Sequence, residues 1–378
     1  METVNTQRRR PAPKKRKGKA AVRILLRTLL VVFTVIVLAV VGLCMVCNLI
    51  FNGPSESARN VLTMSMLESS GMKWFPAIFI GQDKVDEIKS SVSVTLPNDV
   101  SGSDKVVINP GNQLANKEWE HHPDGIRIEY VYGDTYNAYV MLIRDPSAVY
   151  MSTSSDTFST SIPGERIHLQ IVKEGALAAI NAGAFYDNGT TSSVVGSVPE
   201  GLVVADGKVV WNSGKAPKEG FVGFNEDNIM VVAKTMTAEQ AMELKIRDGC
   251  CFGPVLVMDG VVNQEAYNEP SGWNPRTAIG QRADGTVIFL CIDGRQAGSL
   301  GGSYADIIDI MVEFGAVNAC NLDGGSSTVM LYKDTQGLYD DDAKPWGNDI
   351  AMINNYSLLQ KEPRRMPTFF MVRPGSED

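Results

Sequence analysis

The apolar and polar positions divide the chain into two parts with different patterns. Residues 28–51 (TLLVVFTVIVLAVVGLCMVCNLIF) form an apolar run without a charged side chain, long enough to cross a hydrocarbon layer of about 30 Å. From about residue 124 onward, short apolar runs alternate with turns that contain Gly and Asp. The first pattern predicts one membrane-spanning helix, and the second predicts strands joined by hairpins.

Most of the second part is predicted to be β-structure. Hairpins are expected where a Gly–Asp or Asp–Gly pair separates two apolar runs, because such pairs favour tight turns. These pairs are Gly133-Asp134, Asp206-Gly207, Asp259-Gly260 and Asp284-Gly285. Further strands are predicted within LAAINAGAF (177–185) and on both sides of the turn in AVNACNLDGGSSTVMLY (316–332).

Helices are fewer in this part. One is predicted to begin near Pro163, one to occupy residues 237–249 and one to end at Gly315. The second of these starts with a capping box formed by Thr237 and Gln240. The chain is therefore predicted to adopt an α+β fold: a mixed β-sheet domain with hairpins and a few packed helices, preceded by one N-terminal transmembrane helix.

The region between the apolar run and the β-rich part is predicted to be a stalk. Residues 54–92 have helical character on both sides of an interruption, WFPAIFIG, and residues 93–118 have the Pro, Gly, Asn and Ser content of a linker. The chain is therefore predicted to have four segments: a basic cytoplasmic tail at 1–27, the transmembrane helix at 28–51, an extracellular helical stalk and linker at 52–119, and a folded domain at 120–378.

The N-terminal residues 1–27 are strongly basic, whereas the rest of the chain is acidic. The chain has 35 cations and 43 acids, of which residues 1–27 carry ten cations and one acid, leaving 25 and 42 for the rest. A basic tail beside an apolar span stays on the cytoplasmic side and is attracted to anionic lipids. This favours a membrane anchor over nucleic-acid binding. The span is also too long for a cleaved signal peptide. The predicted location is the cell membrane, with a single pass and the domain outside.

No metal or other cofactor is predicted. Outside the apolar span, the cysteines form no CxxC pair, so zinc is not expected, and their spacing establishes no disulfide. The three histidines form no recognisable catalytic set. The acidic run Tyr339-Asp340-Asp341-Asp342 is the one stretch considered for calcium. It lacks the alternating ligand spacing of an EF-hand, which favours a solvated loop.

Three strand ends share a pattern in which an apolar run is followed by a polar group and then by glycine. They carry Asn181, Asp293 with Arg295, and Asp323. Side chains alternate along a strand, so Asn321 shares a face with Asp323. Glycine at such a point lets a ligand or another backbone approach closely. These groups are candidates for a pocket at the end of a rigid sheet.

Two arginines suit an anion near these strand ends. Arg276 directly precedes the apolar stretch TAIG, and together with Arg295 it could form bidentate bonds to a phosphate or carboxylate. Asp323 differs from the other Asp–Gly pairs because Gly-Gly-Ser-Ser follows it. Residue patterns alone leave two interpretations of Asp323 open, an ordinary turn and a functional acid.

Together and in this order, five stretches resemble the phosphodiester glycosidase family. They are INAGAFYD (180–187), GLVVADG (201–207), NPRTAIG (274–280), IDGR (292–295) and NLDGGSST (321–328). The resemblance covers roughly residues 120–373, and Arg365-Met366-Pro367-Thr368 resembles the family's closing Arg-x-Pro.

The chain departs from the family pattern in two places. Ala182 or Ala184 stands where a second glycine is common, and Asn354-Asn355-Tyr356-Ser357 stands where Asn-Arg-Pro-Ser is common. The missing proline predicts a differently shaped loop there.

The resemblance implies a phosphodiester glycosidase-like catalytic domain at 120–378. Its reaction would cleave the glycosidic bond of a sugar-1-phosphodiester, of the N-acetylglucosamine-1-phosphodiester type, in cell-surface glycopolymers. It implies catalytic roles for Asp323, Asp293, Arg276 and Arg295. It implies substrate contacts for Asn181, Gly183, Thr277, Gly324, Gly325, Ser326, Ser327, Asn354 and Arg365.

Two other functions stay open. The tail, span and stalk resemble bacterial surface proteins linked to exopolysaccharide, so a non-catalytic glycan-binding or assembly protein is one alternative. A metal-dependent phosphodiesterase that breaks a P–O bond is the other.

Overall fold

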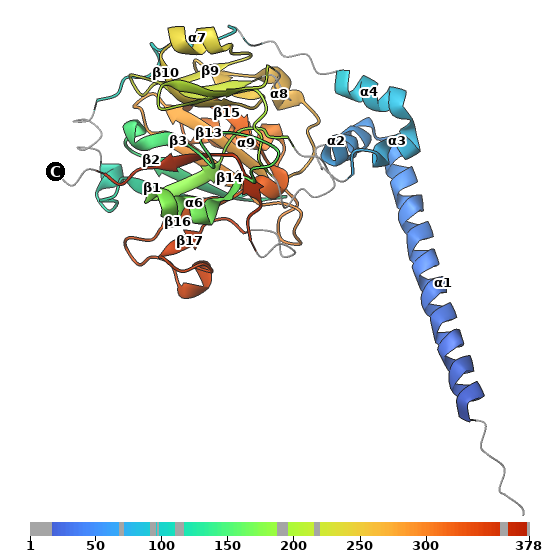
Figure 1. Cartoon of the computed structure of the whole chain (residues 1–378). Coiled ribbons are helices and arrows are strands. Elements are labelled where there is room, and N and C mark those ends of the chain that lie inside the picture. The colour runs from blue at the N-terminus through green and yellow to red at the C-terminus, as the bar shows by residue number, and fades with distance from the viewer. Residues whose placement is uncertain are drawn as a thin grey trace, which may run out of the picture. The chain divides into compact units, whose positions relative to one another are not determined.

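The computed structural model describes residues 17–67, 72–90, 96, 98–109, 117–186, 196–214, 220–355 and 362–375. The chain separates into two compact units, Met1–Ser55 and Glu56–Asp378. Figure 1 shows the ribbon of the whole chain, coloured along the sequence.

In the first unit, the part that the structure describes is mainly one long helix. α1 covers Lys17–Asn52, and its segment Ile24–Asn52 is long and apolar enough to cross a membrane. The predicted span, residues 28–51, lies within it. The hydroxyls of Thr28 and Thr34 donate to carbonyls four residues earlier, so these side chains bring no unsatisfied polar group to the apolar surface.

Three short helices open the second unit: α2 (Glu56–Leu67), α3 (Phe75–Ile80) and α4 (Gln82–Ser90). The stretch WFPAIFIG, which was predicted to interrupt the helical segment, forms α3 itself. Pro76 lies in the first turn of α3, where a missing N–H costs little, and Gly81 ends the helix. Between α4 and the first strand, the side chains of Leu96 and Val106 are buried.

The largest sheet is antiparallel throughout and has seven strands. Their order is β1 (Ile126–Tyr132), β2 (Asn137–Ile143), β14 (Val287–Ile292), β13 (Arg276–Arg282), β15 (Ala316–Leu322), β11 (Val255–Met258) and β12 (Val261–Val262). The hairpins predicted at 133–134, 259–260 and 284–285 are confirmed, because each joins two neighbours in this sheet.

Three smaller sheets complete the β-structure. The first is β7 (Lys208–Asn212), β6 (Leu202–Ala205), β10 (Ile246–Cys251), β8 (Phe221–Asn225) and β9 (Met230–Ala233). The second is β17 (Ile350–Met352), β16 (Met330–Lys333), β5 (Ala178–Asn181), β19 (Thr368–Val372) and β3 (Val149–Thr153). The third pairs β18 (Arg365–Met366) with β4 (Glu165–Arg166). The hairpin at 206–207 joins β6 to β7 and is also confirmed.

Four helices cover the sheets: α6 (Ile167–Glu174), α7 (Ala238–Glu243), α8 (Gln264–Asn268) and α9 (Tyr304–Glu313). Short 3-10 turns lie at η1 (Lys117–Trp119), η2 (Pro146–Ala148), η3 (Gly325–Ser327) and η4 (Asp341–Ala343). The α+β class is confirmed by this mixture of sheets and helices.

Two helix predictions need correction. The capping box of Thr237 and Gln240 is present, but the helix ends at Glu243 rather than continuing to residue 249. Lys245 has a left-handed backbone, with φ of 52°. The residues after it, Ile246–Cys251, form β10, and most of them are buried between neighbouring strands. The helix expected near Pro163 begins at Ile167, after the short strand β4.

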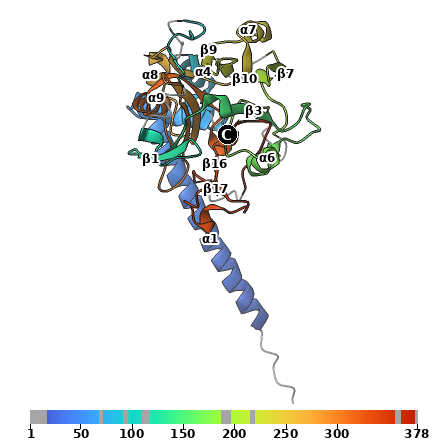
Figure 2. The ribbon, with the colours of Figure 1, turned by 90° about the vertical axis from the view of Figure 1, so that its left-hand side faces the viewer.

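The main core lies between the sheets. It combines buried residues of the seven-stranded sheet, such as Phe289, with residues of both five-stranded sheets, such as Phe224 and Phe370. A second core lies between the other face of the seven-stranded sheet and α9. Figure 2 shows α8 and α9 on the left of this unit and α6 and α7 on its right.

Truncating one residue of the main core tests this arrangement. Phe289→Ala should lower the free energy of unfolding by about 3–5 kcal/mol, because Phe289 is fully buried and leaves a cavity. Tyr132→Ala is the control, since Tyr132 is 76% exposed, and we expect a change within about 0.5 kcal/mol. The measurement is urea unfolding of the full chain in detergent. Equal shifts for the two variants would contradict the assignment of the core.

Candidate active site

Strand register brings three candidate residues to one edge of the seven-stranded sheet. β13 lies between β14 and β15 and runs antiparallel to both, so its start faces their ends. Arg276 pairs with the last residue of β14, and Thr277 pairs with the last residue of β15. Asp293 and Asp323 directly follow those last residues. All three charged groups therefore begin at the same edge.

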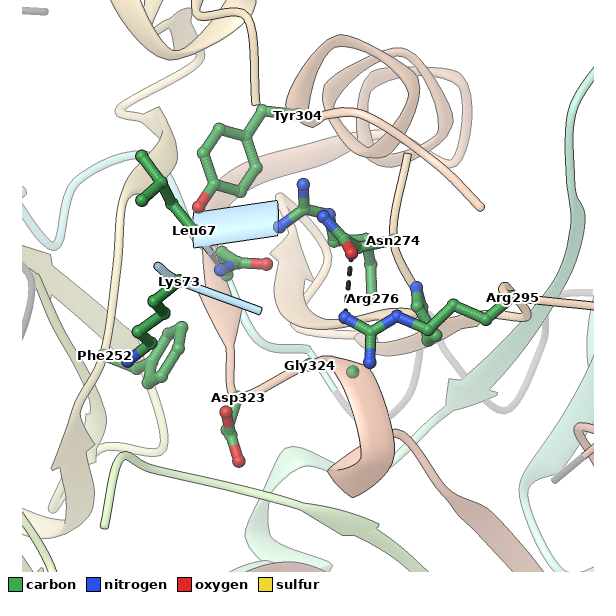
Figure 3. Close-up of a pocket in the computed structure, with 12 residues that line it drawn as sticks. Leu67, Lys73, Phe252, Asn274, Arg276, Arg295, Tyr304, Asp323 and Gly324 are labelled. Atoms are coloured by element: carbon green, nitrogen blue, oxygen red, sulfur yellow. Dashed lines mark hydrogen bonds between the residues drawn. The ribbon is translucent and has the colours of Figure 1, made fainter. Parts of the chain in front are cut away.

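A pocket of about 270 Å³ opens at this edge (Figure 3). Five predicted site residues line it: Asp323, Arg276, Arg295, Gly324 and Gly325. The other lining residues are Leu67, Lys73, Phe252, Asn274, Pro275, Tyr304 and Asn321. The volume lies near the lower end of small-ligand sites, about 300–1,000 Å³, and suits one sugar ring or one phosphate group.

Asp323 is held through its backbone. Its N–H donates to the Ala182 carbonyl at 3.1 Å, and its carbonyl accepts from Nδ2 of Asn181 at 2.5 Å. Oδ1 of Asn181 accepts from the Thr277 hydroxyl at 2.8 Å and from the Val329 N–H at 3.2 Å. Asn181 and Thr277 were predicted to contact substrate. The structure instead places their polar atoms in bonds that fix the backbone of Asp323.

Arg276 is 4% exposed and ties two chain segments, 271–272 and the loop at Gly302, to the sheet edge. Its Nε donates to the Gly302 carbonyl at 3.0 Å, and its Nη2 donates to the carbonyls of Ser271 and Gly272 at 2.8 and 3.1 Å. Its guanidinium also lies 4.5 Å from the centre of the Tyr304 ring. The arginine brings a positive charge to the pocket wall, where reduced water access strengthens its field.

Arg295 reaches the pocket from the loop after β14. Its Nη2 donates to Oδ1 of Asn274 at 2.9 Å, shown as a dashed line in Figure 3. Its Nη1 lies 3.4 Å from the point where Gly325 would carry a Cβ. The backbone of Arg295 is left-handed, with φ of 57°, a conformation that costs about 1–2 kcal/mol for a residue with a side chain. The surrounding contacts therefore hold this guanidinium over the turn that follows Asp323.

The stretch NLDGGSST is a crossover and not a hairpin. β15 before it belongs to the seven-stranded sheet, whereas β16 after it belongs to a five-stranded sheet. A Cβ on Gly324 would lie 2.7 Å from the Pro275 carbonyl, to which the Gly325 N–H also donates at 2.8 Å. These glycines thus first make room for the protein's own backbone, and the Gly325 amide is already used within the protein.

Asp293 is 1% exposed and is not among the residues that line the pocket. Its Oδ2 accepts from the Tyr139 hydroxyl at 2.9 Å and from Nδ2 of Asn355 at 3.0 Å, while its Oδ1 accepts from Nδ2 of Asn354 at 3.4 Å. Burial raises the pKa of Asp293, and the hydrogen bonds oppose this shift. The carboxylate ties the loop after β17 to the end of β14.

Four other predicted residues lie away from the pocket wall. Gly183 is enclosed by β10, and Asn354 accepts from the N–H of the first residue of β16. The Ser327 hydroxyl is fully buried. Arg365 donates to the Gly164 carbonyl at 3.0 Å, which ties β18 to the segment before β4.

Arg364 reaches the crossover instead of Arg365. Its Nη1 donates to Oγ of Ser326 at 3.2 Å, and its guanidinium lies 4.7 Å from the centre of the Phe185 ring. Arg364 directly precedes β18, whereas Arg365 is the first residue of that strand. The closing Arg-x-Pro pattern directed the prediction to Arg365, and no pattern in the sequence indicated the contact that Arg364 makes.

Sequence reasoning also missed much of the pocket wall. Asn321 shares a face with Asp323, as predicted, and its Nδ2 donates to the Gly253 carbonyl at 2.9 Å. Its Oδ1 is buried and makes no hydrogen bond within the described part of the chain, so it can accept one from a ligand. Phe252 directly follows β10, and Tyr304 is the first residue of α9. Neither is a sequence neighbour of Asp323, and no local pattern indicates that they contribute to the pocket.

Among the residues that the structure describes, no group of three or more His, Cys, Asp or Glu side chains is placed to hold a metal ion. In the acidic run once considered for calcium, η4 begins at Asp341. The nearby Asp334 is paired with Lys344 at 2.7 Å. Cys250, Cys251, Cys291 and Cys320 are buried free thiols, and burial raises the pKa of each.

The chain is similar to proteins of one known family. The model of the family described as phosphodiester glycosidase matches residues 174–373, slightly more than half of the chain. The SPbeta prophage-derived uncharacterized protein YomE of Bacillus subtilis (strain 168) is 24% identical over 235 residues, which are 61% of this chain. The match spans 34% of that relative, about a third of its length.

A solved structure shares the fold. It is the catalytic domain of zebrafish N-acetylglucosamine-1-phosphodiester alpha-N-acetylglucosaminidase, auto-inhibited by its pro-peptide. The match has a TM-score of 0.51 and 20% sequence identity, and it covers 66% of this chain and 82% of that domain.

The buried Asp293 predicts a specific pH dependence of stability. Its folded-state pKa is raised above the unfolded value of about 3.9, so its contribution is present below that value and is lost as pH rises through the folded-state pKa. The difference in unfolding free energy between the wild type and Asp293→Asn should therefore shrink as pH rises from about 4 toward neutral.

Asp334→Asn provides a control of opposite sign. Burial acts to raise the pKa of Asp334, but hydrogen bonds from Lys344 and two backbone N–H groups lower it overall. Its contribution is present above the unfolded pKa and is lost as pH falls. Urea unfolding of the full chain at several pH values measures both slopes, and slopes of the same sign would refute the assignment.

Proposed function

Because the chain belongs to the phosphodiester glycosidase family, we propose that it hydrolyses the glycosidic bond of a sugar-1-phosphodiester in cell-surface glycopolymers. The observation that carries the proposal is one pocket lined by a carboxylate, Asp323, and two guanidiniums, Arg276 and Arg295. A substrate with an anomeric carbon joined to a phosphodiester needs these charges. The carboxylate stabilises the positive charge that develops at the anomeric carbon, and the guanidiniums neutralise the charge of the phosphate.

The reaction breaks the bond between the anomeric carbon and the bridging oxygen. The oxygen of water becomes bonded to that carbon, and the phosphate leaves as a monoester that keeps the bridging oxygen. Phosphate is a good leaving group, so protonation by a strong acid matters less than in ordinary glycoside hydrolysis. This agrees with the pocket wall, in which Asp323 is the acidic residue among the lining residues that the structure describes.

We assign Asp323 to the anomeric carbon and Arg295 to the departing phosphate. Arg295 is exposed and lies over the glycine turn, where a phosphate can reach it. Arg276 is tied to three carbonyls and acts as a fixed charge in the wall. Oδ1 of Asn321 accepts a hydrogen bond from a sugar hydroxyl or amide, because it is a buried acceptor at the pocket.

Arg364 adds a third guanidinium on the other side of the crossover. It is 7% exposed, and its hydrogen bond to Ser326 places its charge beside the turn that follows Asp323. We propose that Arg364 and Ser326 contact the phosphodiester together, because an arginine can give parallel hydrogen bonds to phosphate oxygens.

The proposed location is the cell membrane. The basic residues 1–27 and the apolar helix segment Ile24–Asn52 are the features of a single-pass anchor with a cytoplasmic N-terminus. In this orientation the second unit acts outside the cell, where glycopolymers are found.

Hydrolysis in heavy-oxygen water tests the reaction class. The full chain in detergent is incubated with a panel of sugar-1-phosphodiesters, beginning with an N-acetylglucosamine-1-phosphodiester. We expect the label on the released sugar and none on phosphate. Label on phosphate together with loss of activity in chelator would favour a metal-dependent phosphodiesterase. Saturable binding of anionic glycan without product would favour a binding or assembly protein.

Asp323→Asn tests the carboxylate within that assay. The substitution keeps the size of the side chain and removes its charge, so we expect turnover to fall by about 10²–10³-fold while the unfolding midpoint stays unchanged. Asp284→Asn is the matched control, because Asp284 lies in the β13–β14 hairpin and is expected to leave turnover unchanged. Full activity of Asp323→Asn would remove this residue from the mechanism.

The adjacent arginines offer a matched pair for the phosphate contact. Arg364→Lys keeps the charge but loses the forked donor, so kcat/KM should fall roughly ten- to hundredfold. Arg365→Lys changes a residue that faces β4, and we expect less than a twofold change in kcat/KM. Steady-state kinetics on one sugar-1-phosphodiester measures both. A larger loss for Arg365→Lys would reverse the assignment.

A further inference from the structure

Large apolar side chains are exposed beside the pocket. Lys73 lines the pocket, and its neighbours Met72 and Trp74 are 40% and 63% exposed. Ile78 follows Trp74 by four positions along α3 and is 63% exposed. Residues four apart lie on one face of a helix, so Trp74 and Ile78 point to the same side. We call Met72, Trp74 and Ile78 the apolar rim.

α3 has an inner face that explains why the rim is left outside. Pro76 is buried, and the rings of Phe75 and Phe79 lie 5.2 Å apart against each other. α3 also contacts α2 and α4. The helix thus already has an apolar side that packs within the unit. The rim residues are additional apolar surface, and they are exposed together on one short segment.

The composition of the rim matches a lipid surface. Tryptophan is enriched at the level of lipid headgroups, where its ring is in the apolar boundary and its N–H is in the polar layer. Short amphipathic helices with Trp and aliphatic residues on one face lie in this layer, and neighbouring lysines reach lipid phosphates. Lys73 between Met72 and Trp74 supplies that cation.

The chain itself brings a bilayer to this surface. The apolar segment ends at Asn52, and α3 begins shortly after it in the sequence, at Phe75. If that segment spans the membrane, a surface on α3 meets the bilayer at a high effective concentration, so even a weak lipid contact is populated. A soluble protein partner would have no such advantage.

We propose that the apolar rim inserts into the interface of a lipid bilayer, so that the mouth of the pocket beside Lys73 opens at the lipid headgroups. The substrate would then be a sugar-1-phosphodiester held at the membrane surface, with a lipid on the leaving phosphate. This second statement rests on the proposed function, whereas the insertion of the rim does not.

Tryptophan fluorescence in brominated lipids tests the insertion directly. All five tryptophans, Trp74, Trp119, Trp211, Trp273 and Trp346, lie after residue 55, so the apolar helix contributes no tryptophan emission. The full chain is reconstituted into vesicles of phosphatidylcholine and phosphatidylglycerol with bromine on the acyl chains. Any quenching then reports contact between the second unit and the bilayer.

We expect Trp74→Phe to remove most of the quenchable emission. Trp346→Phe is the control, because Trp346 stacks on His168 with the two ring centres 4.5 Å apart, and the quenched amplitude should stay as in the wild type. Equal quenched amplitude in the wild type and in Trp74→Phe would overturn the proposal. Quenching that disappears with a different tryptophan would place the membrane contact elsewhere and would also overturn it.

Kinetics separates this inference from the proposed function. Ile78→Ser should leave kcat/KM unchanged for a water-soluble sugar-1-phosphodiester and lower it at least tenfold for the same headgroup on a vesicle-embedded lipid. Equal losses on both substrates would overturn the membrane-held substrate. Quenching without turnover of any substrate would refute the proposed function and leave the insertion of the rim standing.

Discussion

The site depends on one buried amide that joins two sheets. The Asn181 side chain at the end of β5 donates to the Asp323 carbonyl and accepts from Thr277 and Val329. An amide is suited to this because it offers donors and an acceptor in one plane. In a buried setting each of these bonds is costly to leave unmade. The relative placement of the sheets and the position of Asp323 are therefore set by the same residue.

Around this amide, charged and neutral polar groups have separate tasks. The pocket wall carries the charges of Asp323, Arg276 and Arg295. Asn181 and Thr277, which we call the floor of the site, are held by hydrogen bonds between uncharged groups. Asp293 belongs to neither group, since it is buried among hydroxyl and amide donors beside the loop after β17. Such a division lets the charges face a ligand without the floor competing for it. Pre-set dipoles and charges of this kind need no reorganisation during a reaction.

Local patterns predicted the elements better than their partners. The four Asp–Gly and Gly–Asp hairpins and the capping box at Thr237 were predictable, because each depends on a few adjacent residues. The sheet change at NLDGGSST was not predictable, since a strand looks the same whichever sheet it joins. For the same reason, the sequence indicated Asp323 and Arg276 but could not show that Phe252 and Tyr304 come to the same pocket. Those neighbours depend on long-range pairing.

The backbone of Gly324 lies close to the Pro275 carbonyl, so that a Cβ added to Gly324 would be 2.7 Å from the carbonyl oxygen. This contact limits which residues of the site can be substituted. A side chain there would push the turn that contains Asp323 away from the start of β13, where Arg276 lies. Differences in ligand preference are therefore expected at wall residues such as Phe252 and Leu67, which come from separate segments and can change size independently. A glycine turn that cannot change and a wall that can change would let one fold bind many different ligands.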